Sequence, residues 1–322
     1  MTYAAITGWG KCMPPAVLSN ADLATFLETD DEWIQKRTGI KERRFVPNDG
    51  SMATSDLALA AAQRALADAG VAAKEIDCII LGTLSPDFHF PGTGVVLQKK
   101  LGIAESTNCP CFDIRQQCSA FVYGLQMADA FIRSGTYKRI LLVGAELHSH
   151  SLDFTTRGRD VTVLFGDGAG AMVLGPADTE DPRAGVIYTA VHADGSGAMD
   201  LYLKVFEIHR LPYVHYDPSD RAQNAIMYPY MDGKRVFLNA VRGMVMSTQT
   251  ALAKTGLTWA DIQWFVPHQA NLRINEKVAE VAGIPRDKVL NSIQWYGNTT
   301  AATVPLTIDH WRKQGVVKPG DR

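Results

Sequence analysis

The chain has 322 residues, of which 46% are hydrophobic, and its formal net charge is −2. This length suits two fused units better than one simple core, and the small charge argues against a general nucleic-acid binder. The chain contains no run of 18 or more apolar residues, so we predict no membrane span. The five cysteines lack the spacing of a disulfide framework, which predicts a reducing, cytoplasmic location. The N-terminal residues 1–6 lack the basic and apolar regions of a signal peptide.

An internal repeat links the two halves of the chain. Residues 65–80 (ALADAGVAAKEIDCII) align without gaps on residues 251–266 (ALAKTGLTWADIQWFV) and share five identities. The similarity continues loosely from residues 101–103 to residues 282–284. Chance matching of alanine-rich helices is the alternative explanation. The repeat predicts two copies of one α/β unit, whose equivalent strand ends would converge about a pseudo-twofold axis.

Cys118 lies between a predicted strand and a predicted helix. Residues 109–114 end in a short apolar stretch, and residues 119–133 repeat apolar groups at helical spacing before Gly135, which predicts the helix end. A cysteine at the first helical turn faces unpaired N–H groups and the positive end of the helix dipole, which favour the thiolate. Cys118 is therefore a candidate nucleophile, and a small buried hydrophobic residue is the alternative.

Three other features predict structure rather than chemistry. Residues 166–170 (GDGAG) lack the spacing of a dinucleotide fingerprint and have no helix after them, so we interpret them as a tightly packed turn. Residues 109–111 (CPC) lack the paired spacing of a zinc site, so we predict no metal. His148 and His150 follow a strand-like run, and we interpret them as ordinary surface residues, with lining a cleft as the alternative.

Two polar residues further along the chain are candidate partners of the cysteine. An apolar run, WFVP, ends at His268, and Asn298 lies in a turn within WYGNTTAA. Polar side chains at strand ends commonly form the sites of α/β folds. The repeat alignment places Asn298 opposite Gln117, next to Cys118. A nucleophilic cysteine with a histidine and an asparagine is a recognised catalytic arrangement, so we expect the three to meet.

Five motifs, taken together, resemble one known family. In chain order they are Asp31-Glu32-Trp33-Ile34 with Arg37-Thr38-Gly39-Ile40, Asp113-Ile114 through Cys118-Ser119-Ala120-Phe121, Phe165-Gly166-Asp167-Gly168-Ala169-Gly170-Ala171, Val266-Pro267-His268-Gln269-Ala270-Asn271, and Tyr296-Gly297-Asn298-Thr299-Thr300. They resemble, over nearly the whole chain, the β-ketoacyl-acyl-carrier-protein synthase III enzymes of the thiolase superfamily.

The resemblance implies a fold and an assembly. The expected architecture is α/β, a thiolase-like five-layer α-β-α-β-α fold from two duplicated βαβαβ-type halves, normally a homodimer. Residues 1–175 would form the half that carries the nucleophilic cysteine, and residues 176–322 the half that carries the histidine and asparagine. The family pattern also has a final strand and a glycine-rich turn with a backbone oxyanion donor, which would follow Arg322.

The resemblance also implies a reaction. Cys118 would attack an acyl-CoA and hold the acyl group as a thioester. Malonyl-acyl carrier protein would then lose carbon dioxide, and the resulting carbanion would take the acyl group, which initiates fatty acid biosynthesis. His268 and Asn298 would each donate a hydrogen bond to the enolate oxygen, at roughly 10²–10³ in rate for each donor. No metal or cofactor is needed, since acyl-CoA enters as a substrate.

Binding residues are implied by the same resemblance. By family position, Trp33 and Arg159 would enclose the adenine of coenzyme A, and Arg37 and Asn271 would contact its phosphate and pantetheine parts. Phe90 would cross the dimer interface and limit the acyl pocket of the other subunit. Arg273 and Lys277 would form a basic patch for the acidic carrier protein. Each has a structural alternative: Trp33 could anchor its helix, and the basic residues could be solvated surface charges.

Departures from the family and competing functions complete the prediction. The family usually has glycine where this chain has Ala120, and residues 201–218 are unusually aromatic, so we expect them to cover the acyl site. A thiolase needs a second cysteine, and none follows Cys118. An acyltransferase or condensing enzyme of secondary metabolism, of polyketide or quinolone type, is the alternative. An inactive partner subunit would be expected to lack the three candidate catalytic residues.

Overall fold

A computed structural model describes residues 3–177, 181, 184–204 and 227–322 of the chain. The strands are β1 (Ala4–Cys12), β2 (Val17–Ser19), β3 (Glu42–Arg44), β4 (Cys78–Gly82), β5 (Cys111–Ile114), β6 (Ile140–Glu146), β7 (Gly168–Pro176), β8 (Leu201–Tyr202) and β9 (Tyr230–Met231). The helices are α1 (Asn20–Leu23), α2 (Asp31–Thr38), α3 (Thr54–Ala69), α4 (Thr93–Lys100), α5 (Ala120–Ser134), α6 (Arg159–Thr162), α8 (Gly233–Thr255), α9 (Leu272–Ala282), α10 (Ile293–Tyr296) and α11 (Thr303–Lys313).

Five strands form one mixed sheet in the order β1-β7-β6-β4-β5. β4 is parallel to β5 and β6, whereas β7 is antiparallel to β6 and β1. Every residue of β4 and β6 is buried, and their nearly continuous apolar sequences are typical of strands that are covered on both faces. Because the three parallel strands end at one edge, the segments that follow them meet there.

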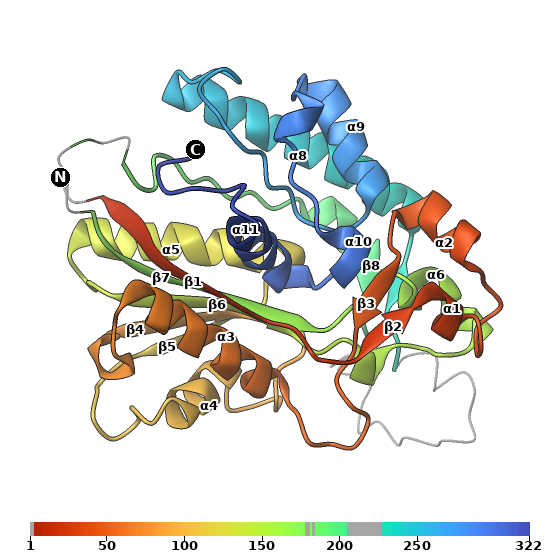
Figure 1. The fold of residues 1–322 in the computed structure, drawn as a ribbon, viewed down its shortest axis with the longest axis horizontal. Coiled ribbons are helices and arrows are strands. Elements are labelled where there is room, and N and C mark those ends of the chain that lie inside the picture. The colour runs from red at the N-terminus through yellow and green to blue at the C-terminus, as the bar shows by residue number, and fades with distance from the viewer. Residues whose placement is uncertain (1–2, 178–180, 182–183, 205–226) are drawn as a thin grey trace.

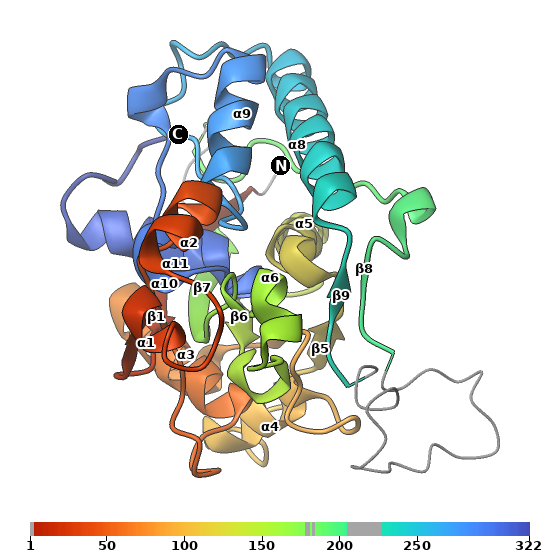
Figure 2. The ribbon, with the colours of Figure 1, turned by 90° about the vertical axis from the view of Figure 1, so that its right-hand side faces the viewer.

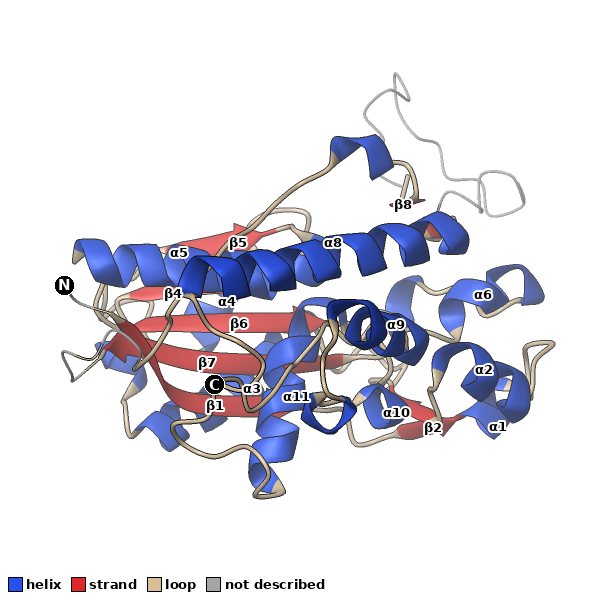
Figure 3. Cartoon of the chain, turned by 90° about the horizontal axis from the view of Figure 1, so that it is seen from above, coloured by secondary structure: helices blue, strands red, loops and turns tan. Residues whose placement is uncertain are grey.

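Helices cover both faces of the sheet and continue into a further layer. α3 and α4 pack on one face, and α5 and α11 pack on the other (Figure 1). α8 and α9 contact each other and lie beyond α5 and α11 (Figures 1 and 3). The helix predicted over residues 119–133 is confirmed as α5, which ends at Gly135 with φ of +73° and buries Phe121, Ala128 and Ile132.

The two halves repeat the same local structure. α3 and α8 each end at a glycine in the left-handed conformation, Gly70 and Gly256. The N–H of Ile79 donates to the carbonyl of Pro110 at 2.9 Å, and the N–H of Phe265 donates to that of Lys288 at 2.8 Å. Both contacts begin a parallel strand pairing. In the second half this pairing is limited, within the described residues, to an isolated bridge between Phe265 and Val289.

The residues around the centre of the repeat correct the predicted alignment. Gln117 and Thr300 have φ of +47° and +48°, and each begins a 3₁₀ turn that leads into α5 or α11. Thr300, rather than Asn298, is therefore the counterpart of Gln117, and Ala301 is the counterpart of Cys118. The alignment was wrong by two residues because the second half has a longer connection, which contains α10.

Glycines allow these turns to approach the strand ends closely. A Cβ atom on Gly144 would lie 2.3 Å from the carbonyl oxygen of Ala301, and one on Gly82 would lie 2.8 Å from the Cβ of Ala120. Ala120, the departure from the family, thus fills the space that Gly82 leaves, and its helical conformation is regular. The close packing predicted for residues 166–170 is also confirmed, because a Cβ on Gly166 would lie 2.4 Å from the carbonyl oxygen of Tyr296. The predicted turn is wrong, because Gly168 already begins β7.

The strands of the five-stranded sheet all lie within residues 4–176. The division into units of residues 1–175 and 176–322 stays a prediction. Of the predicted covering segment 201–218, residues 205–218 lie outside the described residues. Its beginning, β8, pairs with β9 beside α8 (Figure 2). Among the helices of the described residues, none combines the length and apolarity needed to cross a bilayer.

Candidate active site

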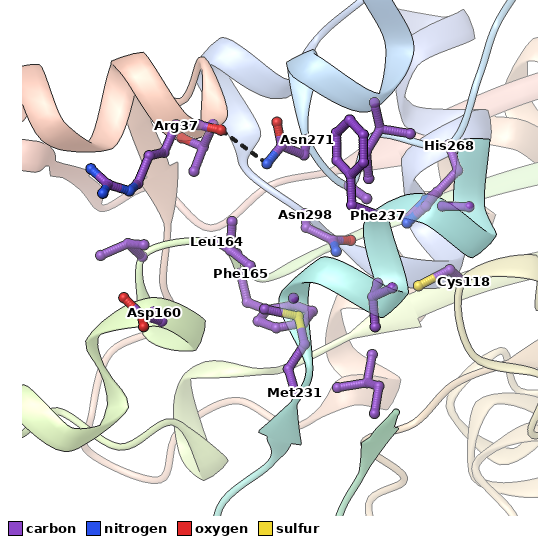
Figure 4. Close-up of a pocket in the computed structure, with 18 of the residues that line it drawn as sticks. Arg37, Cys118, Asp160, Leu164, Phe165, Met231, Phe237, His268, Asn271 and Asn298 are labelled. Atoms are coloured by element: carbon purple, nitrogen blue, oxygen red, sulfur yellow. Dashed lines mark hydrogen bonds between the residues drawn. The ribbon is translucent and has the colours of Figure 1, made fainter. Parts of the chain in front are cut away.

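Cys118, His268 and Asn298 line one pocket of about 650 Å³ (Figure 4). Cys118 lies in the 3₁₀ turn that follows β5, His268 follows the short strand segment at Phe265, and Asn298 precedes the turn that begins at Thr300. The structure thus places the three predicted residues around a single cavity, although they come from distant parts of the chain.

The environment of Cys118 differs from the one expected. The pKa of Cys118 is raised to about 12, chiefly by burial of the thiol and secondly by the negative charge of Glu146. The prediction of a thiolate near neutral pH is therefore wrong for the free protein. The reason is that burial and the negative charge of Glu146 both disfavour the anion, and together they outweigh the backbone N–H that favours it. A base must accept the thiol proton before Cys118 can attack.

Glu146 connects the strand ends beneath the pocket, and sequence reasoning missed it. The residue is fully buried, and its carboxylate accepts hydrogen bonds from the N–H of Leu84 and the hydroxyl of Ser85, at 3.0 and 2.9 Å. It also accepts one from the N–H of Ala301, and burial raises its pKa to about 7. Its place at the end of β6 was the available signal, because His268 was identified by the same criterion.

His268 is a neutral imidazole with one engaged nitrogen. Burial lowers its pKa to about 4. Its Nδ1 lies 2.7 Å from the hydroxyl of Thr303. Its Nε2 is buried, and within the described residues it has no hydrogen-bond partner. Since His268 lines the pocket, this nitrogen is available to a substrate.

Asn298 is fixed on both sides by backbone contacts. Its N–H donates to the carbonyl of Leu164 at 2.8 Å, and its own carbonyl accepts from Gly166 at 3.1 Å. Its Oδ1 accepts from the N–H of Thr300 at 2.9 Å. The amide nitrogen makes no hydrogen bond to a described residue, so its two N–H groups are free to donate to a ligand in the pocket.

His148 was predicted to be a surface residue, and that prediction is wrong. The side chain is 8% exposed, and its ring packs against that of Phe165 at a tilt of 45°, with ring centres 4.6 Å apart. Its Nε2 lies 2.5 Å from the hydroxyl of Thr300. Burial lowers its pKa to about 3. The strand β6 carries the chain past its own end into the interior, which alternation of polar and apolar residues does not reveal. His150 remains partly exposed.

The residues predicted to bind coenzyme A form a stack at the same pocket. The guanidinium carbons of Arg37 and Arg159 lie 4.3 and 4.6 Å from the ring centre of Trp33, and all three residues line the cavity. Cation–π contacts of this kind favour a planar guanidinium. The ring of Trp33 is thus occupied by protein side chains in this structure.

Asn271 also lines the pocket, but its side chain is engaged in structure. Its Oδ1 accepts from the N–H of Arg273 at the start of α9, and its Nδ2 donates to the carbonyl of Arg37 at 3.0 Å (Figure 4). Arg273 and Lys277 lie on the surface of α9, where they pair with Glu276 and Glu280 at 3.0 and 2.8 Å. The predicted basic patch is therefore partly neutralised by its own helix.

Phe90 is not part of this pocket. Its side chain is 82% exposed in the single chain, so the ring does not pack in the interior and can contact a second protein chain. No group of three or more potential metal ligands occurs in the part of the chain that the structure describes. A thiol, an acceptor nitrogen and an amide donor around one cavity can transfer an acyl group through a thioester.

Comparisons with known proteins identify the family to which the chain is similar. Models of two parts of one family, 3-oxoacyl-[acyl-carrier-protein (ACP)] synthase III and its C-terminal region, match residues 112–195 and 252–322. The chain is 44% identical to β-ketoacyl-[acyl-carrier-protein] synthase III 2 of Vibrio cholerae, over 99% of this chain and 83% of that protein. It is 42% identical to β-ketoacyl-[acyl-carrier-protein] synthase III of Laribacter hongkongensis, over 100% of this chain and 94% of that protein. The structure of 3-oxoacyl-[acyl-carrier-protein] synthase III from Aquifex aeolicus matches with a TM-score of 0.86 at 37% identity, over 100% of this chain and 94% of that one.

Proposed function

Because the chain belongs to the 3-oxoacyl-[acyl-carrier-protein] synthase III family of condensing acyltransferases, we propose that it condenses an acyl-CoA with malonyl-acyl carrier protein through a thioester on Cys118. This reaction begins fatty acid synthesis. The observation that supports the proposal is the meeting of Cys118, His268 and Asn298 at one pocket.

The first half-reaction is acyl transfer to the cysteine. The sulfur of Cys118 forms a bond to the acyl carbon, and the bond from that carbon to the sulfur of coenzyme A breaks. Since the thiol of Cys118 has a pKa of about 12, its proton must move as the bond forms. The unpaired Nε2 of His268 accepts that proton and returns it to the departing coenzyme A thiolate.

The second half-reaction is decarboxylative condensation. The bond between the malonyl methylene and its carboxylate breaks, and carbon dioxide leaves an enolate. The Nδ2–H of Asn298 and the Nε2–H of neutral His268 stabilise the enolate oxygen. The methylene carbon then attacks the acyl thioester, a carbon–carbon bond forms, and the bond to the sulfur of Cys118 breaks. The released thiolate takes up one proton from water.

The binding surfaces follow from the same proposal. The adenine of coenzyme A stacks on Trp33 after the guanidinium of Arg159 moves off its ring face, and Arg37 contacts the phosphates. The acidic carrier protein docks by Arg273 and Lys277. The enzyme acts in the cytoplasm as a homodimer in which Phe90 contacts the second subunit. The scheme requires no cofactor besides acyl-CoA as a substrate.

The intact mass of the protein after incubation with acyl-CoAs from acetyl to dodecanoyl tests the first half-reaction. One acyl adduct is expected, and it should be absent from Cys118→Ala. Asn298→Ala should keep this adduct and lose most release of carbon dioxide from malonyl-acyl carrier protein, by roughly 10²–10³. His150→Ala is a matched control outside the pocket. Absence of any adduct would refute the proposal, and the length of the accepted chain would separate fatty acid initiation from specialised condensation.

A further inference from the structure

The hydroxyl of Thr303 lies between two hydrogen-bond partners. Its oxygen is 2.7 Å from Nδ1 of His268 and 3.0 Å from the carbonyl oxygen of Thr300. Thr303 is the first residue of α11 and is 1% exposed. The hydroxyl is therefore shielded from water, and its single hydrogen must point to one of these two partners.

Each direction of this hydrogen fixes a different form of the imidazole. When the hydroxyl donates to the carbonyl of Thr300, it accepts from Nδ1–H of His268, and Nε2 carries only a lone pair. When the hydroxyl donates to Nδ1, the neutral ring carries its proton on Nε2 instead. The ring has a single N–H at neutral pH because burial lowers the pKa of His268 to about 4.

Both arrangements leave the surrounding polar groups paired. The carbonyl of Thr300 also accepts a hydrogen bond from the backbone N–H of Thr303, so it keeps a partner when the hydroxyl turns away. Nδ1 of His268 is paired with the same oxygen in either arrangement. Only hydrogens move between the two states: the ring gives up the proton on Nδ1 and gains one on Nε2 by exchange with water while the pocket is open between substrates, and the hydroxyl then turns to donate to the bare Nδ1. The heavy atoms stay in place, which makes the exchange compatible with a tightly packed interior.

The turn that carries Thr300 is held in place independently of this exchange. His148 contacts the Thr300 hydroxyl at 2.5 Å, and Glu146 accepts from the N–H of Ala301. Thr300 has φ of +48°, a conformation that non-glycine residues keep only where neighbouring contacts enforce it. The carbonyl of Thr300 therefore stays within reach of Thr303 in both states.

The two half-reactions need opposite properties of Nε2. Transfer of the acyl group to Cys118 needs an acceptor for the thiol proton, whereas condensation needs a donor to the enolate oxygen. We propose that Thr303 is a positioning residue whose hydroxyl turns between Thr300 and His268, and so lets His268 accept in the first half-reaction and donate in the second. This inference rests on the proposed function and adds to it a residue that sets the direction of the histidine's hydrogen bond.

Nitrogen NMR of protein labelled with ¹⁵N-histidine tests the exchange directly, because protonated and unprotonated ring nitrogens resonate far apart. The signals of His268 are assigned by comparison with His268→Gln. In the free protein we expect the proton on Nδ1. With saturating acetoacetyl-pantetheine, whose carbonyl oxygens can only accept hydrogen bonds, we expect it on Nε2. The same tautomer in both states would overturn the proposal.

Half-reaction rates of three variants provide the second test. Thr303→Val keeps the branched shape without the hydroxyl and leaves Nδ1 of His268 unpaired, so both half-reactions should slow by about 10- to 100-fold. Thr303→Ser should restore both rates to within about threefold, an allowance for the lost methyl group. Thr307→Val, one turn along α11, removes a buried hydroxyl that does not contact His268, and should leave both rates within about twofold.

The outcomes separate this inference from the proposed function. Equal losses in Thr303→Val and Thr307→Val would indicate a general packing defect and overturn the role of Thr303, as would unchanged rates in Thr303→Val. Thermal unfolding of each variant shows whether Thr303→Val is folded. If it is not, Thr303→Ser with wild-type stability becomes the test: near-normal half-reaction rates support the role of the hydroxyl, and slow rates overturn it. A wild-type protein that forms no acyl adduct refutes the proposed function, whereas the NMR measurement on the free protein stands without any turnover.

Discussion

Alkylation of Cys118 with iodoacetamide should be slow near neutral pH and should accelerate up to the highest pH that the fold tolerates. With a pKa of about 12, against ~8.5 for an ordinary cysteine, the thiolate fraction at pH 7.5 is lower by roughly 3,000-fold. A more basic thiolate is intrinsically more nucleophilic, and a Brønsted slope of about 0.4–0.5 raises the rate constant of the thiolate itself by roughly 40-fold. We therefore expect alkylation about 100-fold slower than that of free cysteine.

The assay follows the peptide that contains Cys118 by mass spectrometry between pH 6.5 and 10. This separates it from the other free thiols, of which Cys111 is also only partly buried. The logarithm of the rate should rise with pH without a plateau. A rapid rate that is already constant at pH 7 would refute the reasoning, since it would show that the helix terminus outweighs burial and the charge of Glu146.

Glu146→Gln provides an internal check on the cause. The charge of Glu146 raises the pKa of Cys118, and a like charge near a titrating group typically shifts its pKa by about one unit. Removal of this charge should therefore raise the alkylation rate at pH 7.5 about threefold, after the lower nucleophilicity of the less basic thiolate is included. Glu280→Gln is the matched control, because Glu280 is exposed on α9 and pairs with Lys277. An equal change in both variants would contradict the assignment to Glu146.

Three further predictions concern stability and substrate binding. Burial raises the pKa of Glu146 to about 7, so the protonated side chain stabilises the fold fully below its ordinary pKa of ~4.3, and this stabilisation is lost as the pH rises through 7. Over that pH range the unfolding free energy of Glu146→Gln should gain about 3 kcal/mol relative to wild type. Parallel pH profiles of the two proteins in urea titrations would contradict the prediction. Gly144→Ala should destabilise by about 1–3 kcal/mol because its Cβ would meet the carbonyl of Ala301, whereas Gly243→Ala, in open space within α8, should stabilise by about 0.5–1 kcal/mol in the same titrations. Trp33→Ala should raise KM for acyl-CoA about tenfold with kcat within about twofold, and a loss confined to kcat would remove Trp33 from the binding surface.

The elements and the meeting of the candidate residues could be predicted because both depend on local patterns. The periodicity of residues 119–133 and the stop at Gly135 describe α5 as it occurs. The repeat predicted that equivalent strand ends of the two halves converge, and Cys118, His268 and Asn298 do line one cavity. Neither inference needs knowledge of how distant side chains pack.

The ionisation of the cysteine could not be predicted in the same way. A helix terminus is visible in the sequence, whereas the burial of the sulfur and its distance from Glu146 are set by packing between segments that are far apart in the chain. Those two effects raise the pKa of Cys118 and exceed the opposing effect of the backbone N–H at the sulfur. The interior position of His148 was missed for the same reason, because the chain continues inward beyond the apolar run of β6.

The duplicated turns show how one backbone conformation supports different roles. Gln117 and Thr300 have nearly the same positive φ, and each places the next residue at the centre of the molecule. In the first half that residue is Cys118, whose sulfur faces the pocket, whereas in the second half it is Ala301, whose N–H binds Glu146. The repeat thus determines where the chain turns, while the residue after the turn determines whether the position is nucleophilic or structural. A sequence repeat can therefore locate the site more reliably than it can assign the roles within it.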